Sequence, residues 1–138
     1  DAVANFDKGV DYANQGQYEL AVAEFTKTID LDPTDAEAYY SRGVAYRYLD
    51  EYQKAIDDFT RAIDLDPNYA EAYYDRGWVY NELGEYQKAI DDLTKAIELF
   101  PESAEAYNNR GVAYRWLGES SKANQDFAKA CELEPSLC

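Results

Sequence analysis

The chain has 138 residues, of which 46% are hydrophobic, and a formal net charge of −15 from 28 acidic and 13 basic residues. This hydrophobic content is typical of a globular protein and argues against a disordered chain. The acidic excess argues against binding to nucleic acids or to anionic membranes, because both need clustered lysine and arginine. No apolar run approaches the roughly 18 to 20 residues of a membrane-spanning helix, so no membrane insertion is expected.

The chain is built from four copies of one 34-residue unit. Residues 36–69 and 70–103 match at 22 of 34 positions without a gap, and the same period extends over 2–35 and 104–137. Repeats of this length stack so that each copy buries its apolar face against its neighbours. We therefore expect a single repeat domain over residues 1–138, part of a longer protein.

Each copy contains two helical patterns separated by a short break. In the third copy Tyr73, Gly77 and Tyr80 recur at helical spacing, Gly84 interrupts the pattern, and Ala89 belongs to its continuation. Two antiparallel helices per copy are therefore expected. The spacing predicts helices, in chain order, over residues 2–15, 18–31, 36–49, 52–65, 70–83, 86–99, 104–117 and 120–133.

These residues resemble the signature of the tetratricopeptide repeat family over nearly the full chain. In the third copy the matching residues are Tyr73, Gly77, Tyr80, Ala89, Ala96 and Pro101. The sequences of the repeats resemble bacterial or archaeal tetratricopeptide arrays more than eukaryotic co-chaperones. The resemblance implies an all-α, right-handed superhelical solenoid of four antiparallel helix pairs, and a non-catalytic protein interaction scaffold.

The sequence lacks the residue patterns of common catalytic and metal sites. The chain has no histidine, which excludes a Ser-His-Asp triad and every histidine-containing zinc site. Adjacent carboxylates such as Asp57 and Asp58 point in different directions from a helix and do not form an acid/base pair. We expect no enzyme activity, no catalytic residue, no metal site and no cofactor.

Arginines recur one residue before a glycine in three copies. Because they repeat with the period, a structural role is expected, in which each arginine pairs with an aspartate on the facing helix. The alternative is that the arginines face a ligand. The expected ladder consists of Arg42, Arg76 and Arg110 with Asp58, Asp92 and Asp126, and Lys8 is the counterpart in the first copy.

In the family that this chain resembles, the first helix of each pair lines a concave groove that holds partner peptides. The resemblance therefore implies a partner-binding set formed by Phe6, Val10, Tyr40, Val44, Arg47, Tyr48, Tyr74, Trp78, Glu82, Val112, Arg115 and Trp116. Exposed aromatic rings of this kind dominate binding hot spots. Such a groove suits a protein or peptide with apolar anchors and some Lys or Arg. Alternatively, several of these rings only fill the space between repeats.

One subclass of the family, the carboxylate-clamp co-chaperones, holds the acidic carboxyl terminus of heat-shock chaperones with Lys, Arg and Asn side chains. The equivalent positions here are occupied by Phe6, Val10, Ser41, Glu71 and Asp75. A frame moved one copy forward gives Tyr40, Val44, Asp75, Glu105 and Asn109. Because neither set has a basic cluster, clamp binding is not expected.

The carboxyl-terminal end leaves two questions open. Cys131 and Cys138 lie too far apart for a disulfide on one straight helix, but Pro135 lets the chain fold back, so a bridge and two free thiols are both possible. A bridge would favour a periplasmic or extracellular location, and free thiols the cytoplasm. The last helix lacks the extra helix that usually covers it in this family. We expect either that the chain continues or that this helix associates with another copy, giving a self-assembling architectural module.

Overall fold

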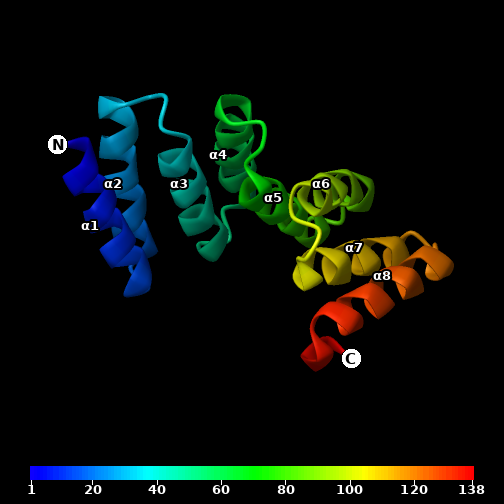
Figure 1. The fold of residues 1–138 in the computed structure, drawn as a ribbon. Helices are drawn as coiled ribbons and strands as arrows, with labels where there is room; N and C mark the ends of the chain where they lie inside the picture. The colour runs from blue at the N-terminus through cyan, green and yellow to red at the C-terminus, as the bar shows by residue number, and fades with distance from the viewer. The chain divides into compact units, whose positions relative to one another are not determined.

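The computed structural model describes all 138 residues and is all-helical, as expected (Figure 1). Eight α-helices follow one another along the chain: α1 (Ala2–Asn14), α2 (Tyr18–Leu31), α3 (Ala36–Tyr48), α4 (Tyr52–Leu65), α5 (Ala70–Glu82), α6 (Tyr86–Leu99), α7 (Ala104–Trp116) and α8 (Ser120–Leu133). A short 3-10 helix, η1 (Pro135–Leu137), follows. The backbone forms two compact units, unit 1 over residues 1–72 and unit 2 over residues 73–138. None of the helices is long and apolar enough to cross a membrane.

The first helix of each pair ends one residue earlier than the sequence predicted. The helix is closed by a residue in the left-handed region, at Gly16, Asp50, Gly84 and Gly118, with φ between 58° and 79°. At the end of α1 the Gly16 N–H donates to the Ala13 carbonyl and the Gln17 N–H donates to the Tyr12 carbonyl. This is the Schellman arrangement, which terminates a helix before the left-handed residue. Apolar periodicity cannot reveal such an end, because it depends on backbone geometry.

The helix pairs pack closely where glycine faces a large side chain. A Cβ atom added to Gly43 on α3 would lie 2.7 Å from the ring of Phe59 on α4, and one added to Gly77 would lie 2.8 Å from Leu93. No real Cβ makes so short a contact, so these positions need glycine for close approach. Phe59 and Leu93 are fully buried as a result.

Cys131 on α8 and Cys138, which follows η1, are joined by a disulfide. Of the two arrangements that the sequence left open, the structure has the bridged one. α8 ends at Leu133, and η1 turns the chain back so that the two Cα atoms lie 4.7 Å apart. On this end of unit 2 Phe127 is half-buried, whereas its counterparts Phe25 and Phe59 are buried.

Asp50 is the only one of the four helix-closing residues that is not glycine. A side chain in the left-handed region clashes with the following carbonyl, and glycine avoids this cost. We therefore expect Asp50→Gly to raise the free energy of unfolding by about 0.5 to 1 kcal/mol, measured by urea denaturation.

The reciprocal substitution Gly84→Asp, at the same place in the next repeat, is the matched control. It should lower the free energy of unfolding by a similar amount, about 0.5 to 1 kcal/mol. Equal stability of both variants and the wild type would show that the left-handed residue carries no measurable strain.

Candidate binding groove

A cavity of about 430 Å³ opens on unit 1 between the first helices of two successive repeats, and we refer to it as the groove. No charged side chain lines it, and most of its wall is apolar or aromatic. α1 contributes Val10, Ala13 and Asn14, α2 contributes Tyr18 and Phe25, and α3 contributes Tyr40, Ser41, Val44, Ala45 and Tyr48. Concave apolar cavities of this size with a few polar groups are typical ligand sites. Four of the residues implied by the family resemblance therefore meet here.

An aromatic stack forms one rim of the groove. The rings of Tyr18 and Tyr48 lie nearly parallel, with centroids 4.7 Å apart and 5° between their planes. The guanidinium of Arg47 lies 5.6 Å from the centroid of the Tyr48 ring. Tyr48 is nevertheless 56% exposed. A ring held in place by a neighbour but still open to solvent loses little rotamer freedom on binding a partner.

The other expected aromatic residues of unit 1 are partly committed to packing. Phe6 lies against Phe25, with centroids 5.5 Å apart. Tyr40 lies against Phe59 at 5.8 Å and against Tyr69 at 5.0 Å. Both Phe6 and Tyr40 are half-buried. Tyr40 lines the groove, whereas Phe6 does not line it and packs on Phe25, which does.

Unit 2 has an aromatic stack at the same repeat positions. Trp116 on α7 lies parallel to Tyr86 on α6, with centroids 5.8 Å apart and 3° between the planes. Trp116 is 67% exposed. Arg115 lies over the half-buried ring of Phe127, with its guanidinium 4.6 Å from the ring centroid.

A polar network occupies part of the expected binding face of unit 2. The Asn109 side-chain amide donates to the Tyr74 hydroxyl at 2.9 Å, and the Asn81 amide donates to the Asn109 carbonyl at 3.0 Å. Asn81 Oδ1 is buried without a hydrogen-bond partner. Of the remaining residues expected in the groove, Trp78 and Val112 are half-buried and Glu82 is exposed.

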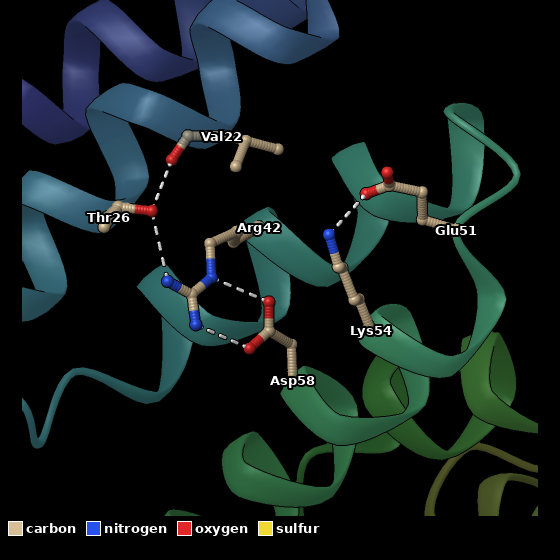
Figure 2. A network of polar contacts seen from close by, with 6 residues as sticks. All are labelled: Val22, Thr26, Arg42, Glu51, Lys54 and Asp58. Atoms are coloured by element: carbon tan, nitrogen blue, oxygen red, sulfur yellow. Dashed lines mark hydrogen bonds and ion pairs between the residues drawn. The ribbon is translucent and has the colours of Figure 1, made fainter.

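The recurring arginines each make two hydrogen bonds to the aspartate on the facing helix. Arg42 Nε and Nη2 donate to Asp58 at 2.8 Å each (Figure 2). The corresponding distances are 2.7 and 2.8 Å from Arg76 to Asp92, and 2.8 Å for both bonds from Arg110 to Asp126. In the first repeat Lys8 lies 3.8 Å from Glu24. Neither Arg42 nor Asp58 lines the groove, and each arginine–aspartate pair joins the two helices of one repeat.

The third guanidinium nitrogen of Arg42 and of Arg110 reaches the preceding repeat within the same unit. Arg42 Nη1 donates to Thr26 Oγ1 on α2 at 3.1 Å, while Thr26 itself donates to the Val22 carbonyl at 2.7 Å (Figure 2). Arg110 Nη1 donates to Thr94 at 3.2 Å. The threonine contact was not anticipated from the sequence, although Thr26 and Thr94 recur with the period and could have pointed to it.

Burial disfavours the charged forms of the arginine and the aspartate, whereas the hydrogen bonds between them favour the charged forms. Burial raises the pKa of Asp58 above its ordinary value, although the hydrogen bonds from Arg42 act in the opposite direction. The same hydrogen bonds raise the pKa of Arg42, so the guanidinium stays charged. The two parallel hydrogen bonds therefore fix the geometry of the pair, and the cost of removing both charges from water offsets part of their favourable energy.

No group of three or more Cys, Asp or Glu side chains is arranged to hold a metal ion. What the arrangement offers a partner is therefore an apolar groove, two exposed aromatic stacks and an acidic surface.

Comparisons with known proteins agree with this architecture. A family model described as Tetratricopeptide repeat matches residues 36–69 and 70–103, and a second of the same description matches 104–137. A third, described as TPR repeat, matches residues 9–48. A search of curated protein sequences gave no significant match.

Several solved structures are similar to nearly the whole chain. A crystal structure of MamA is 39% identical and has a TM-score of 0.94, over 99% of this chain and 80% of that one. MamA 41-end from Desulfovibrio magneticus RS-1 is 27% identical and has a TM-score of 0.93, over 97% of this chain and 76% of that one. The first TPR of Spaghetti (RPAP3), bound to the HSP90 peptide SRMEEVD, is 31% identical, with a TM-score of 0.83 over 85% and 93%.

The arginine ladder can be tested by a double-mutant cycle. Arg42→Met leaves the buried Asp58 carboxylate without its partner and should lower the free energy of unfolding by about 3 kcal/mol. The double variant Arg42→Met, Asp58→Leu should lose less than Arg42→Met alone, because no buried charge remains. Urea denaturation measures the four proteins of the cycle, which are the wild type, Arg42→Met, Asp58→Leu and the double variant.

Arg61→Met is the control for loss of an arginine, since Arg61 is exposed on α4. It should change the free energy of unfolding by less than about 0.5 kcal/mol. Additive losses in the Arg42 and Asp58 variants would contradict a coupled pair.

Proposed function

Because the chain belongs to the tetratricopeptide repeat family, a family of protein interaction scaffolds, we propose that its groove in unit 1 holds a segment of a partner protein. The observation that supports this proposal is the uncharged cavity of about 430 Å³ bordered by the exposed Tyr48. A cavity of this volume accommodates one or two apolar side chains of a bound segment. The role is non-catalytic, and bringing proteins together is its consequence.

The charge of unit 1 indicates what the segment carries besides an apolar anchor. Residues 1–72 contain 16 acidic and 6 basic residues, a net charge of −10, so most of the chain's net charge of −15 lies in this unit. Several of the basic residues are already paired, among them Arg42 with Asp58 and Lys54 with Glu51. A segment with lysine or arginine is therefore attracted, and an acidic one is repelled.

The similar Spaghetti structure holds a peptide that is rich in acidic residues. The positions that would form a carboxylate clamp here have no lysine or arginine, and two of them are Glu71 and Asp75. We therefore propose that this chain does not share that ligand, despite its similar fold. Its partner segment is basic and apolar instead.

The groove proposal predicts that a double variant, Val44→Ser with Tyr48→Ala, loses its partner. Each change removes apolar surface from the groove without touching the arginine ladder, so circular dichroism should show an unchanged helix content. Captured partner should decrease about tenfold or more, because exposed aromatic anchors carry much of the binding energy. The measurement is affinity capture from a native extract, followed by a titration with the identified partner.

Leu20→Ala is the matched control, because Leu20 is also an exposed apolar residue, 48% exposed, but lies on α2 and does not line the groove. It should retain the wild-type partner. Equal capture by the wild type and the groove variant would reject the groove as the binding surface.

Self-assembly through the last helix is the alternative function, and the ladder residues argue against stacking in repeat register. The position of Thr26 and Thr94 is occupied by Ala128 in the fourth repeat, and the arginine position is occupied by Lys8 in the first. An end-to-end stack would therefore lack the arginine–threonine bond that joins repeats 1 and 2. We expect the molar mass from light scattering to remain that of a monomer, 15.7 kDa, at all concentrations. A mass that rises with concentration would favour self-assembly.

A further inference from the structure

One helix in the chain is preceded by a tyrosine where its counterparts have a capping residue. The side chains of Asp1, Asp35 and Ser103 accept hydrogen bonds from the N–H groups of Ala4, Ala38 and Ala106 at the starts of α1, α3 and α7. At the start of α5 the same place is occupied by Tyr69. The only side-chain oxygen of tyrosine lies at the far end of its ring and cannot make this bond. The repeat therefore gives up a favourable cap at this one position.

The Tyr69 ring instead packs on a residue of the groove. Its centroid lies 5.0 Å from that of Tyr40, with 31° between the planes, and Tyr40 lines the cavity. Both rings are half-buried. This tyrosine pair extends the aromatic surface of the groove toward the amino-terminal ends of α3 and α5.

Negative charge converges on the same place. Glu37 and Glu71 are exposed residues in the first turns of α3 and α5. Burial, followed by the charges of Glu37, Glu71, Asp35 and Asp66, raises the pKa of the Tyr69 phenol well above its ordinary value. The phenol is therefore neutral, and its surroundings are acidic.

We propose that the tyrosine pair, together with Glu37 and Glu71, forms a subsite for an arginine or lysine side chain of the segment bound in the groove. The proposal rests on the proposed function and adds where the basic residue binds. A guanidinium group can stack on a tyrosine face while it donates to carboxylates, which makes arginine the stronger occupant. Neither a carboxylate nor an apolar side chain would benefit from both features.

The position of the subsite sets the direction and spacing of the segment. Glu37 precedes Val44 by seven residues on α3, which corresponds to about 10 Å along the helix axis. An extended segment covers this distance in about three residues, and a helical one in about seven. The basic residue should therefore lie three or seven positions from the apolar anchor, always on the same side of it.

The test is a selection of random dodecapeptides displayed on phage against the full chain. Peptides enriched by the wild type should carry Arg or Lys at one of those two spacings from an aliphatic or aromatic anchor. Enrichment of acidic residues at that position, or of groove-dependent peptides without a basic residue, would overturn the subsite while leaving the groove proposal intact. If no enriched peptide depends on Val44 and Tyr48, both proposals fail.

The best selected peptide is then titrated against isosteric variants by fluorescence anisotropy. Glu37→Gln with Glu71→Gln removes the charges without changing shape and should weaken binding about tenfold, with a weaker salt dependence than the wild type shows. Tyr69→Ser should also weaken binding about fivefold, whereas Tyr69→Phe should keep wild-type affinity.

Glu105→Gln, at the equivalent place in the fourth repeat, is the control and should bind like the wild type. Replacing arginine by citrulline removes the positive charge of this side chain of the peptide. The citrulline peptide should bind the wild type about as weakly as the arginine peptide binds the double glutamine variant. Unchanged affinity in the double glutamine variant, or equal binding of the citrulline peptide to the wild type, would overturn the subsite.

Discussion

The architecture depends on one side chain that acts in two directions. Arg42 binds Asp58 within its own repeat through two hydrogen bonds and reaches Thr26 in the preceding repeat with its remaining nitrogen. The guanidinium is planar and carries donors on both edges, so no other residue can make these three contacts at once. The same residue lies between Ser41 and Val44 on α3, which line the groove. The contact that joins two repeats therefore also fixes the wall of the proposed binding surface.

The helices could be predicted because the repeat makes every pattern visible four times. All four second helices begin and end where the periodicity places them, from Tyr18–Leu31 to Ser120–Leu133. The first helices end a residue early, because their ends depend on a left-handed backbone at residues such as Asp50 rather than on side-chain pattern. The disulfide between Cys131 and Cys138 could not be decided from spacing alone, since the answer depends on how tightly the chain turns at Pro135.

The candidate site was predictable only in part. The repeat register predicts that Val10, Val44 and Tyr48 share one face, and all three line the same cavity. It could not reveal that Tyr48 stacks on Tyr18 or that Tyr40 packs on Tyr69, because such contacts join residues about 30 positions apart and depend on how far one helix slides along another. Periodicity identifies the face of a helix, whereas ring stacking requires its depth and tilt.

The positions at which the four copies differ are the most informative about function. Residues common to all copies, such as the glycines that face Phe59 or Leu93, serve the stack and would be needed for any partner. A departure that costs local stability needs a different reason. Tyr69 cannot form the cap that Asp35 and Ser103 form at the starts of their helices. Its ring instead provides an aromatic face that lies beside the groove and near the exposed Glu37 and Glu71. At this one first helix the cap is exchanged for an aromatic contact beside the groove, and this is the place where we propose that a basic side chain binds.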